Sequence, residues 1–78
     1  MLQLPLETAF SLGVQLAQLR DKWKSSGPLH ALRVTEIENA MIALNTAIGV
    51  SVRARIGRVY ITDHSLIEEA EYLEFAAS

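Results

Sequence analysis

Two short stretches of the sequence contain the residues best suited to chemistry. Arg53, Arg55, Arg58 and Tyr60 lie within eight positions of one another, and the tripeptide Asp-His-Ser follows at 63–65. Guanidinium groups bind phosphates and carboxylates, and a tyrosine ring offers a flat surface for stacking. Aspartate, histidine and serine are the three residue types of a hydrolase triad. The first stretch therefore suggests anion binding, and the second suggests catalysis.

Catalysis by the tripeptide at 63–65 is disfavoured by its geometry. Successive side chains leave the backbone in different directions, whereas a nucleophile needs its base within hydrogen-bonding distance. We expect these residues to close a turn and to begin a helix. The two histidines, His30 and His64, are far apart in the sequence, there is no cysteine, and no glycine-rich phosphate loop is present. We therefore predict that the protein is not an enzyme and binds no metal or cofactor.

The arginines lie in a segment whose alternation predicts a β-hairpin at 50–62. A two-residue turn at Gly57-Arg58, of the type that places glycine at positive φ, brings the two strands into register. Residues opposite each other in a hairpin share a face. In this register the apolar face consists of Val52, Ala54, Ile56, Val59 and Ile61, and the polar face of Ser51, Arg53, Arg55, Tyr60 and Thr62.

Three interpretations of the arginines are open at this point. They solvate the outer face of the hairpin or pair with the acidic end of the chain, they contact nucleic acid, or they contact an acidic surface of a partner protein. Residues 1–62 carry seven basic and four acidic groups, whereas residues 63–78 carry five acidic groups and no lysine or arginine. Exposed ion pairs contribute only ~0–1 kcal/mol each. Stability alone is therefore a weak reason to cluster arginines.

A long helix is predicted at 6–24, and its apolar surface is unusually wide. Pro5 suits the start of a helix, and Ser-Ser-Gly-Pro at 25–28 ends it. At 100° per residue the apolar side chains cover an arc of about 220°, roughly twice the stripe that an ordinary surface helix buries. One flank therefore needs cover from the middle of the fold or from another chain. We expect a homodimer whose interface includes Ala9, Phe10, Gly13 and Leu16.

Two more helices are predicted from their start signals. The second occupies 35–48, with a capping box formed by Thr35 and Glu38 and with Gly49 at its end. Residues 29–34 are compatible with either a helical turn or a short third strand. The final, acidic helix begins with a second capping box at Ser65. Its apolar stripe consists of Leu66, Ala70, Leu73 and Ala77.

Length and composition limit the class of protein. A chain of 78 residues forms a single small domain, 1–78, with a marginal core. Because disulfides are excluded, oligomerisation is the remaining way to add stability. No basic leader opens the sequence, and no apolar run approaches the roughly 20 residues that a membrane span needs. We expect a soluble, cytoplasmic protein that binds no membrane.

These observations together predict a small α+β fold with a long helix, a second helix, a two-stranded antiparallel hairpin and a short acidic C-terminal helix. The predicted function is that of a non-catalytic protein–protein interaction module, a regulator, adaptor or inhibitor. It would associate with itself and with an unidentified protein. The alternative is a nucleic-acid-binding protein whose basic hairpin at 50–62 is a wing-like contact surface formed by Arg53, Arg55, Arg58 and Tyr60.

Overall fold

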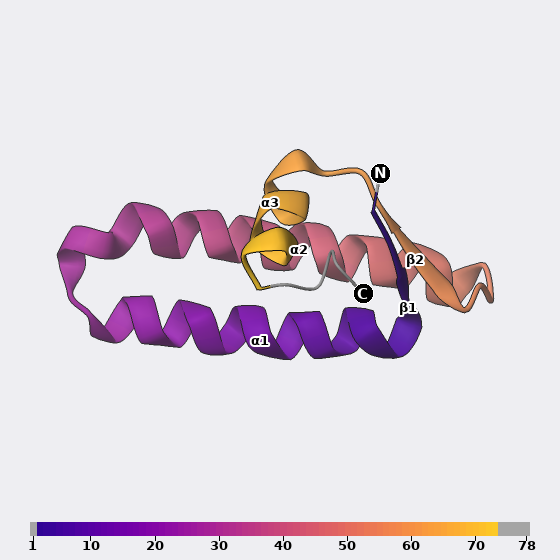
Figure 1. Cartoon of the computed structure of the whole chain (residues 1–78), viewed down its shortest axis with the longest axis horizontal. Coiled ribbons are helices and arrows are strands. Elements are labelled where there is room, and N and C mark those ends of the chain that lie inside the picture. Colours follow the sequence, from indigo (N-terminus) through magenta and orange to yellow (C-terminus); the bar gives the residue numbers. More distant parts are fainter. Residues whose placement is uncertain (1, 74–78) are drawn as a thin grey trace.

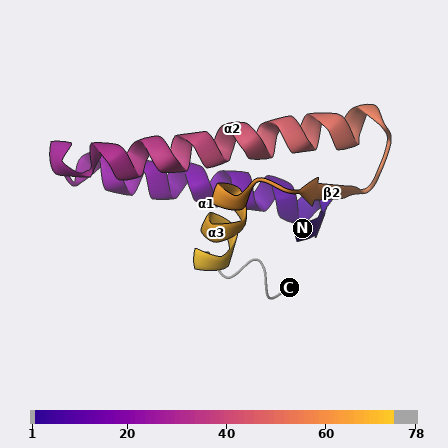
Figure 2. The same ribbon diagram turned by 90° about the horizontal axis from the view of Figure 1, so that it is seen from above.

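The chain has a mostly helical α+β fold, seen in a computed structural model that describes residues 2–73. Two long helices form an antiparallel hairpin, and a two-stranded antiparallel sheet and a third helix lie against one side of it (Figures 1 and 2). In chain order the elements are β1 (Leu2–Pro5), α1 (Leu6–Ser25), the short 3₁₀ helix η1 (Pro28–His30), α2 (Ala31–Arg53), β2 (Arg58–Ile61) and α3 (His64–Tyr72).

The first helix matches the prediction for 6–24 to within one residue. The hydroxyls of Ser25 and Ser26 donate to the carbonyl of Lys22 at 2.9 Å, which satisfies an acceptor at the open end of α1. Gly27 then takes a φ of 107°, which residues with a side chain rarely adopt. Pro28 begins η1, so the Ser-Ser-Gly-Pro sequence makes the turn between the two long helices.

The second helix is longer at both ends than predicted. Residues 29–34 are helical rather than a strand, and α2 continues past Gly49 to Arg53. Thr35 is not a cap, because its hydroxyl donates to the Ala31 carbonyl inside the helix at 3.1 Å. A mid-helix glycine costs about 1 kcal/mol relative to alanine. The helix nevertheless continues past Gly49, with Ile48 and Ser51 buried on either side of it.

The predicted hairpin at 50–62 does not form as drawn from the sequence. Residues 50–53 belong to α2, and only residues 58–61 are a strand. β2 pairs instead with β1, near the N-terminus, in an antiparallel register that sets Leu4 opposite Val59 and Leu2 opposite Ile61. The alternation in this half of the segment is confirmed, since Val59 and Ile61 are buried while Tyr60 is exposed. The predicted Gly57-Arg58 turn is wrong, because α2 includes residues 50–53 of the predicted first strand and residues 54–57 form no strand.

The register also explains why a proline fits in β1. The backbone amide of Leu6 donates to the carbonyl of Gly57 at 3.0 Å, which makes these two residues a hydrogen-bonded pair. Hydrogen-bonded and non-hydrogen-bonded pairs alternate along an antiparallel ladder. Pro5 and Arg58 therefore form a non-hydrogen-bonded pair, and the missing N–H of Pro5 costs the ladder nothing.

The core lies between the helical hairpin and the layer made by the sheet and α3. α3 begins one residue earlier than predicted, because Asp63 rather than Ser65 caps it and accepts a hydrogen bond from the Leu66 amide at 3.1 Å. Ala77, the last residue of the predicted stripe, lies outside the described residues. The large side chains with at most 1% of their surface exposed come from every major element: Leu4, Leu12, Leu16, Ile37, Leu44, Val59, Ile61 and Leu66.

A left-handed residue ends α2. The amide of Arg55 donates to the Val52 carbonyl at 3.1 Å, and the amide of Ile56 donates to the Ser51 carbonyl at 2.9 Å. This pair of hydrogen bonds defines a Schellman motif, which places Arg55 at the position that glycine usually occupies. Arg55 has a φ of 58°, the one positive φ among the non-glycine residues described. An L-residue in this region costs roughly 1–2 kcal/mol.

We predict that Arg55→Gly stabilises the protein. Glycine relieves the steric cost of the left-handed conformation but loses more chain entropy on folding, so the net gain should be about 0.5–1 kcal/mol. Urea denaturation followed by circular dichroism measures the change. Arg55→Ala is the matched control, because it removes the same charge and keeps the Cβ atom. An equal gain from the alanine variant would show that charge, rather than backbone strain, is the cause.

Candidate functional site

The Asp-His-Ser tripeptide has structural contacts rather than the geometry of a triad. Asp63 caps α3, and the Nε2 of His64 lies 2.9 Å from a carboxylate oxygen of Glu68, one helical turn further on. This i, i+4 relation was overlooked in the sequence because the helix was expected to begin at Ser65. Within residues 2–73, no group of three or more His, Asp or Glu side chains is arranged to hold a metal ion.

An arginine that sequence reasoning passed over makes the central polar contact of the molecule. The two guanidinium NH₂ groups of Arg33, on α2, face the two carboxylate oxygens of Glu69, on α3, at 2.5 and 3.0 Å. Only 6% of Glu69 is exposed. The Arg33 guanidinium also lies 5.5 Å from the ring centre of Tyr72 and 6.0 Å from that of Trp23. Arg33 thus connects all three helices.

Trp23 and His30 belong to the same region. Their ring centres are 4.7 Å apart in an edge-to-face arrangement, and Trp23 packs against the hydrophobic core. Its indole nitrogen is buried and has no hydrogen-bond partner among the described residues. Arg33 also forms an ion pair with Glu36, three residues further along α2. This i, i+3 pair is the part of the cluster that spacing in the sequence could have indicated.

Arg53, Arg55 and Tyr60, which were predicted on one face of a hairpin with Arg58 at its turn, do not share a strand face. Arg53 ends α2, Arg55 lies in the following turn, and Arg58 begins β2 two residues before Tyr60. All three arginines are exposed, and no ion pair joins them to a carboxylate of residues 2–73. The segment that carries them is the far tip of the molecule (Figure 1). We call Arg53, Arg55 and Arg58 the arginine tip.

Pairing of these arginines with the acidic end of the chain was one of the open interpretations, and the described residues do not support it. Glu69 pairs with Arg33, and Glu68 pairs with His64. The basic and acidic parts of the sequence are therefore not joined by an ion pair between the arginine tip and α3. Among residues 2–73, no carboxylate forms an ion pair with the arginine tip.

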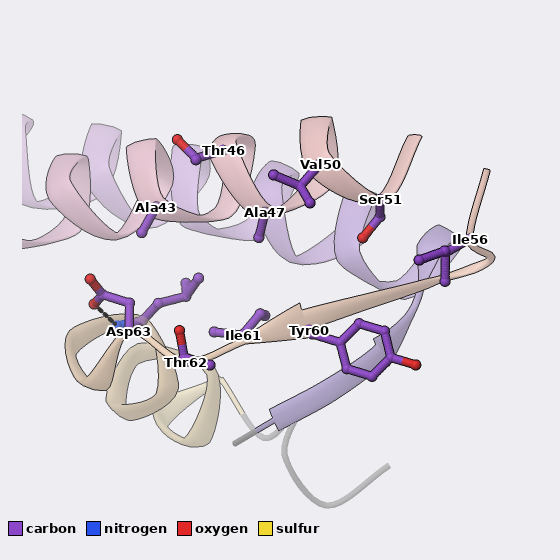
Figure 3. Close-up of a pocket in the computed structure, with 11 residues that line it drawn as sticks. Ala43, Thr46, Ala47, Val50, Ser51, Ile56, Tyr60, Ile61, Thr62 and Asp63 are labelled. Carbon is purple, nitrogen blue, oxygen red and sulfur yellow. Dashed lines mark hydrogen bonds between the residues drawn. The ribbon is translucent and has the colours of Figure 1, made fainter. Parts of the chain in front are cut away.

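An apolar groove runs from the arginine tip toward the start of α3, between α2 and β2. Its volume is about 390 Å³. Figure 3 shows Ala47, Val50 and Ser51 on the α2 side, with Tyr60 and Ile61 on the strand opposite. We call this hollow the strand groove. Its lining residues are Ala43, Thr46, Ala47, Val50, Ser51, Ile56, Tyr60, Ile61, Thr62, Asp63 and Leu66.

A second hollow, of about 290 Å³, lies between α1 and α2 and is lined only by residues of these helices. We call it the hairpin groove. Of the four predicted interface residues, Phe10 and Gly13 line it, with 52% of Phe10 exposed. Ala9 and Leu16 have no exposed surface, because they pack inside the chain, so they cannot contact a second copy. The lining consists of Phe10, Gly13, Val14, Ala17, Met41, Asn45 and Ile48.

Comparison with known proteins assigns no relative. No family model, no curated protein and no solved structure matches the chain. No helix within residues 2–73 is both long enough and apolar enough to cross a membrane. Function is therefore inferred from the two grooves and the arginine tip.

We predict that Glu69→Leu destabilises the protein by about 2–3 kcal/mol. It leaves the partly buried Arg33 with only the longer, exposed pair to Glu36, and a broken buried pair costs several kcal/mol, reduced here because about a quarter of the Arg33 side chain meets solvent. Urea denaturation measures the loss. Adding Arg33→Met should restore much of it, since no partly buried charge without a close partner then remains. Glu68→Leu, at the exposed neighbouring position, should change the free energy of unfolding by less than about 0.5 kcal/mol; an equal loss there would contradict this explanation.

Proposed function

We propose that the protein is a non-catalytic protein–protein interaction module, a regulator, adaptor or inhibitor, that works as a homodimer through the hairpin groove. The observation that carries this proposal is an apolar face without cover. The sheet and α3 lie on one side of the helical hairpin, and no described element lies on the other (Figure 2). On that face 59% of Val14 and 52% of Phe10 are exposed.

The charge of this face favours a second copy of the chain. None of the residues that line the hairpin groove is ionisable. Two copies can therefore meet there without placing like charges together, which is a penalty that specific interfaces avoid. Asn45 carries both a donor and an acceptor, so it can pair with its own counterpart across a twofold axis. The molecule measures 40 × 24 × 19 Å, so its broad face accommodates the ~800 Å² per partner of a standard interface.

Gly13 supports the same proposal. A Cβ atom at this position would lie 3.6 Å from Leu44 Cδ2, an ordinary van der Waals contact. Packing of α1 on α2 therefore does not require glycine here. Glycine in a helix interior costs about 0.5–1 kcal/mol relative to alanine. Close approach of a second chain at the hairpin groove accounts for a residue that the internal packing leaves unexplained.

We predict that Val14→Asp converts a dimer into a monomer. An unpaired carboxylate at the centre of an apolar interface should weaken association by at least about a hundredfold. Light-scattering mass on a size-exclusion column, at several loading concentrations, measures the effect. Leu29→Asp is the matched control, because Leu29 is 95% exposed at the turn between the long helices and lies outside the groove. A monomeric wild-type chain, or equal loss with the control, would contradict the homodimer.

Nucleic-acid binding is the second candidate function, and the exposed arginine tip favours it. Phosphates are suitable anions for these guanidinium groups, which pair with no carboxylate of residues 2–73, and Tyr60, 43% exposed, offers a stacking surface nearby. Two features weigh against it: the chain has a net charge of −2, and α2 carries Glu36 and Glu38 on its exposed surface.

If this second candidate is right, a labelled single-stranded DNA of 20 nucleotides should bind at low salt. The three arginine-tip contacts should then give a slope of about −2 in log K against log salt concentration. Fluorescence anisotropy measures both quantities. Replacing the three arginines with glutamine should abolish DNA binding. The double variant Lys22→Gln with Lys24→Gln, near the other end of the molecule, should leave the DNA affinity unchanged. No binding at 50 mM salt would exclude this function.

A further inference from the structure

The two edges of the small sheet differ in what they offer to another strand. Because Leu6 and Gly57 form a hydrogen-bonded pair, the alternation of the ladder turns the backbone groups of Arg58 and Tyr60 away from β1. The same alternation turns those of Gln3 and Pro5 to the outer edge of β1. Pro5 has no N–H, so the β1 edge lacks a donor at that position, a recognised way of blocking strand addition.

The edge of β2 is open to strand addition. No backbone or side-chain group of residues 2–73 hydrogen-bonds the outward N–H and C=O groups of Arg58 and Tyr60. The strand groove lies along this edge, between β2 and α2, whereas β1 lies on the other side of β2 (Figure 3). An added strand would therefore gain backbone hydrogen bonds and place alternate side chains against apolar residues.

Charge is distributed unequally along the strand groove. The arginine tip lies at one end, next to Ile56, and Asp63 lines the other end. Arg55 adopts a left-handed conformation that glycine would adopt at a lower free-energy cost, and residues in such conformations concentrate at functional sites. A bound segment that carries its acidic residues at the arginine end and none at the Asp63 end matches both charges.

We propose that the open edge of β2 is a strand-addition site for an extended segment of a partner protein, apolar in its middle and acidic at its C-terminal end. Antiparallel pairing continues the existing sheet, and β2 runs from the arginine tip toward Asp63. The added strand therefore runs the other way, which brings its C-terminal end to the arginines. An extended peptide suits this site better than nucleic acid, because phosphates and bases neither pair with a strand edge nor fill an apolar groove in alternation.

This site is distinct from the hairpin groove, so it is testable without the dimer. The experiment uses the full chain carrying Val14→Asp and two labelled peptides of the same composition. One peptide has alternating threonine and valine followed by two aspartates, and the other has the aspartates first. Fluorescence anisotropy should show the first peptide binding at least about tenfold more tightly, and the difference should shrink as salt rises. Equal binding of both peptides, or binding of neither, would overturn the proposal.

Proline variants test the strand edge itself. Tyr60→Pro removes an outward N–H and no hydrogen bond to β1, so it should weaken binding of the first peptide about tenfold. Gln3→Pro makes the same change on the outer edge of β1 and should leave binding unchanged. Circular dichroism verifies that each variant folds. In the wild-type chain with the same peptide, protection of the Arg58 and Tyr60 amides from hydrogen exchange gives a second readout that does not depend on the variants.

Three results would assign the edge to a different partner and overturn the peptide proposal. Equal affinity of the Tyr60→Pro and Gln3→Pro variants would show that the peptide binds elsewhere. A lower light-scattering mass for the Tyr60→Pro variant than for the otherwise identical chain that keeps Tyr60 would show that a second copy occupies the edge. Tighter binding of a DNA oligonucleotide than of the first peptide, with loss on replacing Arg53, Arg55 and Arg58 by glutamine, would assign the arginine tip to nucleic acid. The mass of the Val14→Asp variant reports separately on the homodimer.

Discussion

The helical hairpin carries more apolar surface than the other elements of residues 2–73 cover, and most features of the molecule follow from that. The sheet and α3 bury one side of the hairpin, where Leu12, Leu16, Ile37 and Leu44 lose all contact with water. The other side stays open, with Phe10 and Val14 more than half exposed. A small domain cannot enclose both faces of two long helices. The hairpin groove is the physical consequence, and self-association is the use that we propose for it.

The buried contact between Arg33 and Glu69 sets where α3 sits on the hairpin. α3 is short and buries few residues, chiefly Leu66 and Ala70, so apolar packing alone leaves its position weakly specified. A guanidinium and a carboxylate that satisfy each other are costly to separate, because either alone would remain poorly hydrated. The rings of Trp23 and Tyr72 near the guanidinium extend this contact to both neighbouring helices. The ion pair thus adds specificity where the hydrophobic effect, which has no direction, supplies little.

The sheet shows a corresponding division between closed and open edges. Pro5 lies at the one place in β1 where it removes no ladder hydrogen bond, and it makes the outer edge of β1 a poor template. β2 has no such residue, and its open edge adjoins an apolar groove and three arginines that pair with no carboxylate of residues 2–73. Strand edges that are left open usually need protection from unwanted pairing. The open edge of β2 beside this groove is the observation on which our strand-addition proposal rests.

Local sequence signals determined the pieces of this protein that depend on neighbouring residues. The first helix, its end at the Ser-Ser-Gly-Pro turn, the alternation of Val59, Tyr60 and Ile61 and the α+β class all follow from periodicity and turn chemistry. The tertiary structure decided the rest. Residues 50–53 continue α2 despite Gly49 and their strand pattern, with Ser51 buried and a Schellman motif ending the helix, and β2 pairs with a four-residue strand too short to be recognised in advance. Arg33 and Glu69 meet across 36 positions, a distance in sequence over which no local pattern carries information.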